Sequence, residues 1–303
     1  MKTNKTNQKR HLQNLSAVCL SVFLFVTAAF AQPPKLPENG KIAFAGIDKG
    51  HYDIFTINSD GTELVNITNS PEHDEISPSW SPDGEKLAFL YKLYTNAYVL
   101  GYMDKDGSNT TFLIEVLLSG SSGDTISWSP DGKKIAFTSH GEIYTIDNDG
   151  SNIVNITNDP AIDRQPSWSP DGETIAFSRQ ESSDYRVYTV NADGKKLERT
   201  LLGVGFSGAT AAKYSPDSTR FLYFDDLWGD CSCLISAKTD GTNNIILAYN
   251  SSSADWSPDG LKVVFAGWDG SSSQIYVMPA NGDGRQDQIG PKNARQPDWQ
   301  PLP

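Results

Sequence analysis

Charged and amide side chains gather in the short segments that precede six aromatic residues spaced along the chain. Such residues bind ligands through ion pairs and hydrogen bonds, and a mixture of His, Asp, Glu and Arg can also support acid–base chemistry. No carboxylate pair recurs at a recognisable spacing, so we predict a binding role and assign no catalytic residue. The candidate binding residues are His73, Asp74, Glu75, Asp124, Asp163, Arg164, Gln165, Arg295 and Gln296.

Motifs for a nucleophile or a zinc ion are not formed. Gly205–Ala209 reads Gly-Phe-Ser-Gly-Ala and misses the last glycine of the G-x-S-x-G pattern. His51, His73 and His140 are far apart and are not spaced as zinc ligands. We therefore expect no metal centre and no cofactor.

A calcium ion is the alternative interpretation of the Asp-x-Asp-Gly segments. Asp147, Asp149 and Asn152 offer oxygen atoms, but the downstream bidentate glutamate of a calcium loop is absent. A hairpin turn explains the same residues more simply.

A repeated unit must position the candidate residues. Its core is Trp-Ser-Pro-Asp-Gly followed by a short apolar run, with weaker copies at Tyr214 and Trp299. The leading aromatic residues are Trp80, Trp128, Trp168, Tyr214, Trp256 and Trp299. Their spacings of 48, 40, 46, 42 and 43 residues are typical of propellers and other stacked repeats.

Each unit is predicted to contain four strands. The first ends in the aromatic residue, and Pro-Asp-Gly then makes a tight turn because Pro fixes φ and Gly supplies a positive φ. In one unit the remaining strands are the apolar Ile135–Phe137, the β-branched and aromatic Ile143–Ile146, and the polar, outermost Asn155–Thr157. No segment after residue 31 shows a sustained helical period.

The two ends of the repeated region complement each other. The region opens with a second strand, Lys41–Phe44, and closes with a first strand, Pro297–Trp299. Together they make one whole unit, so we predict an all-β fold, a six-bladed β-propeller closed by pairing of its N- and C-terminal strands. Closure would remove the exposed sheet edges of an open array.

The repeat resembles that of the TolB-type WD40-like propeller family in its Trp-Ser-Pro-Asp-Gly, Ile-Ala-Phe and Ile-Tyr-x-x-x-x-Asp-Gly elements. The resemblance covers about residues 41–301. It implies six blades with the Pro-x-Trp strand innermost, and a propeller that binds protein partners; other members are attached to peptidases or act on carbohydrates. Only Gln32–Gly40 precede the first predicted strand, so we expect the propeller alone, without the α/β domain found before it in TolB.

The N-terminus has the pattern of a secretory signal peptide at residues 1–31. A basic start is followed by the apolar run Leu15–Phe30 and by Ala29-Phe30-Ala31, an A-x-A cleavage site. We expect a mature chain that begins at Gln32, with a short extension (32–40) before the propeller (41–303), in the periplasm or secreted. An uncleaved anchor is the alternative.

Composition limits the partners. Removal of residues 1–31 leaves 21 basic against 37 acidic residues, a net charge of −16. So acidic a chain repels phosphate backbones, and nucleic acid is excluded. Cys231 and Cys233 are expected to be packed thiols, with a strained disulfide as the alternative.

Three functions remain open from the sequence. The first is a non-enzymatic binding module for a protein or peptide of the cell envelope at the mouth of the central channel. The second is a carbohydrate-active propeller, a polysaccharide lyase or glycosidase, that uses the same channel. The third is a structural envelope protein.

Overall fold

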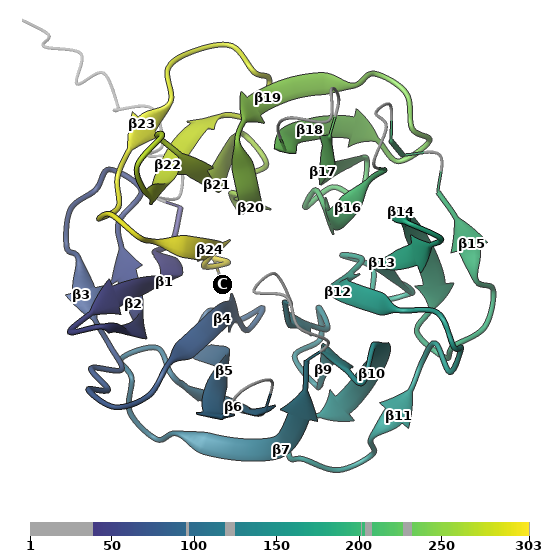
Figure 1. Cartoon of the computed structure of the whole chain (residues 1–303), viewed down its shortest axis with the longest axis horizontal. Helices are drawn as coiled ribbons and strands as arrows, with labels where there is room; N and C mark the ends of the chain where they lie inside the picture. Colours follow the sequence, from purple (N-terminus) through teal and green to yellow (C-terminus); the bar gives the residue numbers. More distant parts are fainter. Residues whose placement is uncertain are drawn as a thin grey trace, which may run out of the picture. The chain divides into compact units, whose positions relative to one another are not determined.

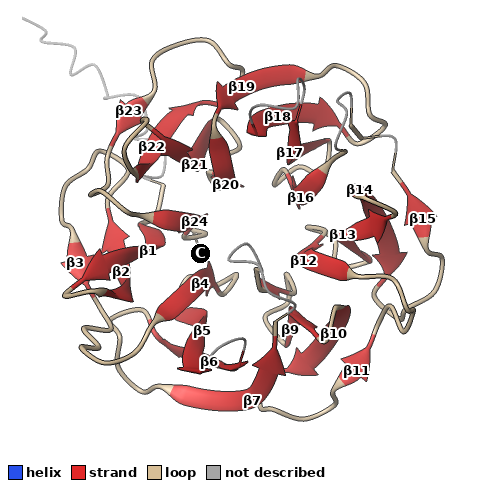
Figure 2. Ribbon diagram, in the orientation of Figure 1, coloured by secondary structure: helices blue, strands red, loops and turns tan. Residues whose placement is uncertain are grey.

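The computed structural model describes residues 39–94, 97–118, 125–200, 202–203, 208–226 and 232–302. In these ranges the chain forms six antiparallel four-stranded sheets, the blades, which succeed one another around a central channel (Figure 1). Figure 2 shows strands and loops only, and among the described residues no helix has the length and apolar character needed to cross a membrane.

Each blade is given from its innermost to its outermost strand. Blade 1 consists of β24 (Arg295–Trp299), β1 (Ile42–Asp48), β2 (His51–Ile57) and β3 (Val65–Asn66). Blade 2 consists of β4 (Glu75–Trp80), β5 (Lys86–Tyr94), β6 (Ala97–Asp104) and β7 (Thr111–Leu117). Blade 3 consists of β8 (Ser127–Trp128), β9 (Lys134–Ser139), β10 (Glu142–Asp147) and β11 (Val154–Asn155).

The other three blades follow the same order. Blade 4 consists of β12 (Asp163–Trp168), β13 (Thr174–Glu181), β14 (Asp184–Asn191) and β15 (Glu198–Arg199). Blade 5 consists of β16 (Thr210–Tyr214), β17 (Arg220–Asp226), β18 (Ser232–Lys238) and β19 (Ile245–Tyr249). Blade 6 consists of β20 (Ser251–Trp256), β21 (Lys262–Trp268), β22 (Ser273–Pro279) and β23 (Asp287–Gln288).

The ring closes as the sequence predicts. β24 pairs with β1 in antiparallel register, with Trp299 opposite Ile42 and Asp298 opposite Ala43. In Figure 1 the yellow C-terminal strand lies beside the purple N-terminal one. The indole Nε1 of Trp299 also donates a 3.1 Å hydrogen bond to the Gly40 carbonyl. The predictions of six blades and of closure by the two ends are confirmed.

The Ser-Pro-Asp-Gly turns explain why the first two strands of a blade pair so regularly. In blade 2 the Ser81 hydroxyl donates to Asp83 at 2.6 Å and accepts the Lys86 N–H at 2.8 Å. Asp83 also accepts the Glu85 N–H, while Gly84 adopts a φ of 68°. The serine and the aspartate therefore fix a turn whose left-handed position favours glycine.

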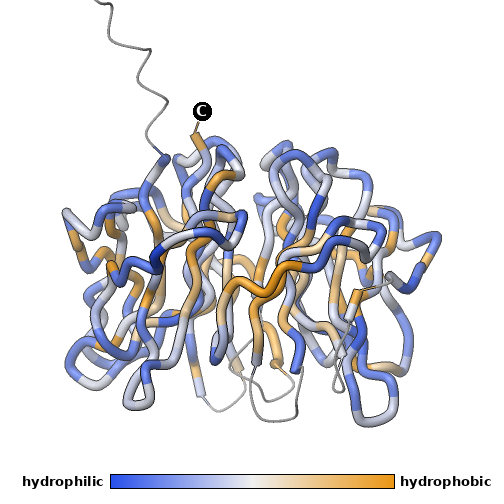
Figure 3. Tube along the Cα trace, turned by 90° about the horizontal axis from the view of Figure 1, so that it is seen from above, coloured by the Kyte–Doolittle hydropathy of each residue, from blue (hydrophilic) through white to orange (hydrophobic). Residues whose placement is uncertain are grey.

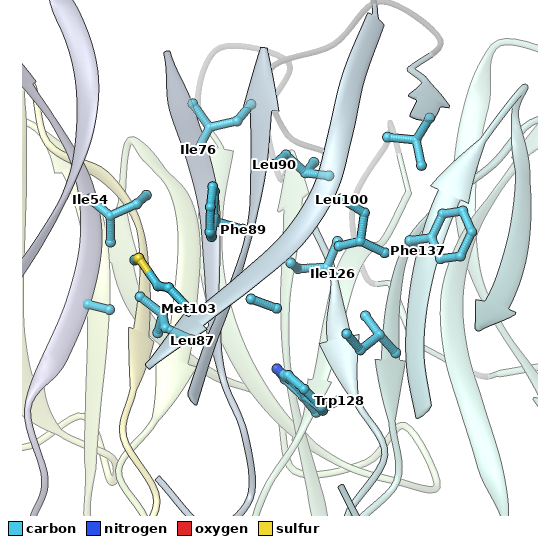
Figure 4. Close-up of a cluster of buried hydrophobic side chains, with 14 of the residues drawn as sticks. Ile54, Ile76, Leu87, Phe89, Leu90, Leu100, Met103, Ile126, Trp128 and Phe137 are labelled. Atoms are coloured by element: carbon cyan, nitrogen blue, oxygen red, sulfur yellow. The ribbon is translucent and has the colours of Figure 1, made fainter. Parts of the chain in front are cut away.

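The aromatic residues that lead the repeats are packed between blades. The five tryptophans of the repeat are at most 8% exposed, and the indole of Trp128 donates to the Ser79 carbonyl of the preceding blade. Figure 4 shows one such cluster, in which Ile54 of blade 1, Phe89 of blade 2 and Trp128 of blade 3 belong to one hydrophobic core. The core thus runs from blade to blade, while hydrophilic residues colour the loops in Figure 3.

Candidate functional site

The central channel contains a cavity of about 120 Å³ lined by all six blades. We call it the connector-side cavity, because its walls are formed where the innermost strands begin, after the connectors from the outer strands. A volume of this size admits a ligand side chain or several ordered waters. Its lining includes Ser77, Thr125, Gln165, Ala211, Ser252, Ser253, Arg295 and Gln296.

A β-bulge recurs in the wall of this cavity. Ser77, Gln165, Ala211 and Gln296 have φ values of 55°, 58°, 52° and 55°, and the strand register shifts beside each of them. Left-handed backbone at a non-glycine residue costs about 1–3 kcal/mol and is concentrated at functional sites. Bulges also redirect side chains. Four of the six blades therefore carry local strain at the same level of the channel.

A second cavity lies where the innermost strands end, and we call it the turn-side cavity. Its lining includes Trp80, Trp128, Trp168, Tyr214 and Trp299, together with Lys213, Asp255 and Asp298. Lys213 also lines the connector-side cavity. Its ammonium group thus lies between the two halves of the channel.

Lys213, Asp255 and Asp298 form a charged triad between the two cavities. The Lys213 ammonium is 2.9 Å from Asp298 Oδ1 and 3.3 Å from Asp255 Oδ1. Although burial pushes the pKa of Lys213 down, the two carboxylates raise it above its ordinary value. Burial also raises the pKa of Asp255 to about 6, against the opposing effect of Lys213. Lys213 is therefore a protonated cation over the whole physiological range.

The triad also joins neighbouring blades. Asp298 of blade 1 accepts the backbone N–H of Trp80 in blade 2, and Asp255 of blade 6 accepts that of Trp299 in blade 1, both at 2.8 Å. In blade 3, Ser127 accepts the N–H of Trp168 in blade 4. The residue before the aromatic is thus an acceptor for the next blade, and these bonds hold the channel wall together.

The structure places the predicted residues in several different environments. Gln165, Arg295 and Gln296 line the connector-side cavity, and Arg164 precedes Gln165. His73 is exposed and stacks on Tyr91 with ring centroids 4.9 Å apart. Asp124 lies outside the described residues, as do residues 1–38, Cys231 and part of Gly205–Ala209; Cys233 is buried.

The other predicted acids lie between blades rather than in the cavity lining. Asp74 accepts the Tyr52 N–H and forms a 2.8 Å ion pair with Lys92. Asp163 is fully buried and receives two 2.8 Å hydrogen bonds from Arg179. Such a two-pronged pair fixes the start of β12 against β13. The sequence pattern shows that these acids precede the aromatic strands, but the partners that bury them come from other strands.

Glu75 is 2% exposed and lies near the buried Asp53 of blade 1. Burial raises the pKa of Glu75 to about 7, and the Ser70 and Thr68 hydroxyls oppose this only in part. One carboxyl oxygen of Glu75 is buried without a hydrogen-bond partner. Glu75 therefore holds a proton at pH values where an ordinary glutamate is ionised.

Replacement of Glu75 by Gln is expected to remove a pH dependence of stability. Between pH 4.5 and about 7 the folded chain keeps a proton that the unfolded chain has released, so wild-type stability falls as pH rises through this window. The loss is about 3 kcal/mol. Urea unfolding at pH 5 and pH 8 measures it. Between these two pH values the wild type should lose about 2.5 kcal/mol more than the E75Q variant, whereas Glu63→Gln at an exposed ion pair should follow the wild type. Equal losses in wild type and E75Q contradict the assignment.

Lys213 and the tyrosines beside the two arginines were not identified from the sequence. Lys213 was missed because it precedes Tyr214, the aromatic residue of a weak copy of the repeat. The signal that could have found it is that the residue before the aromatic varies among otherwise similar strands. Arg295 lies 3.7 Å from the ring centre of Tyr52, and Arg164 lies 5.5 Å from that of Tyr185. No sequence spacing links these partners. Within the described ranges, no cluster of three or more metal-ligating side chains occurs.

Comparison with known proteins relates this fold to a family. A family model described as the TolB beta propeller domain matches residues 119–303. A curated relative, the protein TolB homolog of Chlorobium luteolum, is 38% identical over 66 residues, which are 22% of this chain and only 15% of that protein.

Two solved structures share the fold. TolB from Acinetobacter baumannii superposes with a TM-score of 0.76 at 23% identity, over 86% of this chain and 67% of that chain. Oligogalacturonate lyase from Vibrio parahaemolyticus superposes with a TM-score of 0.54 at 17% identity, over 83% and 74% of the two chains. These identities show a common architecture alone. Since the family model covers more than half of the sequence, the chain belongs to the TolB β-propeller family.

Proposed function

We propose that this chain is an exported, non-enzymatic binding module that takes a segment of a cell-envelope protein into the connector-side cavity. The observation that carries the proposal is the chemistry of the cavity wall. All six blades contribute, and the described lining residues include hydroxyls, amides, Arg295 and Lys213 but no carboxylate, histidine or cysteine. Lys213 stays protonated between its two carboxylates, so it is a poor general base.

Export and protein binding have independent support. The basic start, apolar run and Ala29-Phe30-Ala31 of the N-terminus favour a cleaved signal peptide and a periplasmic or secreted location. Membership of the TolB propeller family favours a protein partner. The carbohydrate alternative shares only its fold with the lyase, and it needs a base that the described cavity wall does not supply.

A photo-crosslinking amino acid at Ser252 tests the proposal. Ser252 is exposed and lines the connector-side cavity. In living cells of the source bacterium, irradiation is expected to attach one envelope protein of defined mass, because a docked segment would lie within reach. Mass spectrometry of the adduct identifies it.

The matched control carries the same amino acid at Leu261. This residue also belongs to blade 6 and is 62% exposed, but it follows the Pro-Asp-Gly turn that ends the innermost strand. It should give no such adduct. Absence of an adduct at Ser252, or the same adducts at both positions, rejects a partner at the connector-side cavity.

A further inference from the structure

A groove of about 320 Å³ lies on the connector side of the ring, where blades 5 and 6 meet, and we call it the Trp268 groove. Blades 5 and 6 are neighbours in Figure 1. The volume lies in the range of small-molecule sites, about 300–1,000 Å³. Ser252 lines both this groove and the connector-side cavity, so the two spaces adjoin. The groove lining includes Ser232, Asn250, Ser251, Ser252, Trp268 and Ser273.

Trp268 places an exposed ring at the end of a buried strand. It is the last residue of β21, in which the five preceding residues are buried, yet Trp268 is 54% exposed. The second strands of four other blades end in the polar residues Asp48, Ser139, Glu181 and Asp226. A large ring at this position presents its face to a ligand. Such a face attracts C–H groups through dispersion and through the negative charge of its π-system.

Short hydroxyl and amide side chains surround the indole. The connector into blade 6, Asn250–Ser253, contains one asparagine and three serines. Ser232 comes from blade 5, and Ser273 begins the strand beside Trp268. The side chains of Ser232, Asn250, Ser252 and Ser273 form no hydrogen bond with another residue that the structure describes. Each of them can donate and accept, so they are available to a ligand rich in hydroxyl groups.

The backbone around the groove is already paired. The Trp268 N–H donates to the Asn250 carbonyl at 2.9 Å. Ser251 lies opposite Gly267, and Ser273 lies opposite Trp268 in the ladder. An extended peptide that binds by adding a strand needs a free backbone edge. Recognition in this groove therefore falls to the side chains, which favours a ligand other than a peptide strand.

The lining of the groove selects for no ionic charge. Among the described residues, it includes no acidic or basic side chain. Asp269, which follows Trp268, accepts the N–H groups of Ser271 and Ser272 at 2.8 and 2.9 Å and so belongs to its own hairpin turn. A chain with a net charge of −12 also repels acidic ligands. An uncharged ligand with one apolar face and many hydroxyls fits these features best.

We propose that the Trp268 groove binds a neutral saccharide, with one sugar ring stacked on the indole and its hydroxyls hydrogen-bonded to Asn250 and the surrounding serines. A sugar ring suits the groove because its C–H face packs on an aromatic ring while its edge donates and accepts hydrogen bonds. The inference goes beyond the proposed function, because it adds a ligand class and a site beside the connector-side cavity and requires no protein partner.

Isothermal titration calorimetry with cellotetraose, maltotetraose and chitotetraose tests the inference. At least one of these neutral tetrasaccharides is expected to bind the wild type, with an affinity that does not change with salt. Trp268→Ala should weaken that binding about tenfold, and Trp268→Phe, which keeps a smaller ring, should weaken it less. Asn250→Gly removes the amide but suits the left-handed φ of 54°, and it should weaken binding about fivefold.

Tyr94→Ala is the matched control. Tyr94 is 62% exposed and ends the second strand of blade 2, as Trp268 does in blade 6, but its hydroxyl donates to Glu115. This variant should bind the tetrasaccharide as the wild type does, and Trp268→Ala should keep the wild-type thermal midpoint. Absence of binding by all three tetrasaccharides, or equal affinity in wild type and Trp268→Ala, overturns the proposal. Tighter binding of tetragalacturonate than of the three neutral probes also overturns it, in favour of an acidic saccharide.

The failure of this inference can be told apart from a failure of the proposed function. If no tetrasaccharide binds but the crosslinker at Ser252 captures an envelope protein, the proposed function stands and the saccharide inference fails. If a tetrasaccharide binds through Trp268 and Ser252 gives no adduct, the reverse holds. Loss of the adduct in Trp268→Ala, with no tetrasaccharide bound to the wild type, would assign the groove to the protein partner.

Discussion

Deletion of Arg295–Pro303, which removes β24, is expected to abolish cooperative folding of the propeller. The deletion exposes the edge of β1 and removes Trp299, which is 3% exposed. Burial of an indole of about 200 Å² at about 25 cal/mol per Å² contributes about 5 kcal/mol. Domains are stable by only about 5–15 kcal/mol, so the loss approaches the whole stability. Far-ultraviolet circular dichroism during thermal unfolding measures it.

Two further variants show whether closure of the ring is responsible. Trp299→Ala should destabilise the full chain by about 3–5 kcal/mol. Trp268→Ala is the matched control, because that indole is 54% exposed at the end of β21, and its effect should stay within about 0.5 kcal/mol. Addition of a synthetic peptide of residues 293–303 to the truncated chain should restore the sigmoidal transition. A truncated chain that unfolds at the wild-type temperature would contradict closure by β24.

The architecture was predictable because each of its signals is local and repeated. The aromatic before Ser-Pro-Asp, the glycine with positive φ and the apolar second strand occur together in unit after unit. The count of blades followed from the unmatched ends, Lys41–Phe44 and Pro297–Trp299. One copy can depart from the pattern without changing the prediction, because the other copies keep it; Ser218, for example, stands where the other turns have glycine.

The fate of individual charged residues was less predictable. Glu75 and Asp163 stand three residues before the proline of their innermost strands, one position earlier than Arg164 and Arg295, and both acids are buried. In the strand register, Asp163 lies opposite Arg179 and Glu75 lies opposite Tyr91. A single sequence does not predict which residue of the neighbouring strand lies opposite a given side chain. The bulges at Gln165 and Gln296 shift the register further.

The triad in the channel shows the same limit. Lys213, Asp255 and Asp298 are separated by about one repeat each, and they meet only because the ring brings the same position of blades 5, 6 and 1 together. Alignment of the six innermost strands gives Ser79, Ser127, Ser167, Lys213, Asp255 and Asp298 at this position. Only the closed ring makes one lysine and two aspartates neighbours.

Lys213→Met is expected to destabilise the propeller by about 3–5 kcal/mol at pH 8, because it leaves Asp255 and Asp298 buried without their cation. The loss should shrink at pH 5. Burial already raises the pKa of Asp255 to about 6, and below that value a proton can replace the lost positive charge. Denaturant unfolding of the variant and the wild type at both pH values measures the difference.

Two controls separate charge from packing. Lys105→Met breaks an ion pair with Glu85 in which both side chains are more than half exposed, and it should cost less than about 1 kcal/mol at either pH. Addition of Asp255→Asn and Asp298→Asn to Lys213→Met should restore most of the stability, since the amide oxygens can still accept the N–H groups of Trp299 and Trp80. The stability loss of Lys213→Met could instead be equal at both pH values and not be reversed by the two asparagines. That result would mean that packing of the aliphatic part of Lys213, rather than its charge, stabilises the propeller.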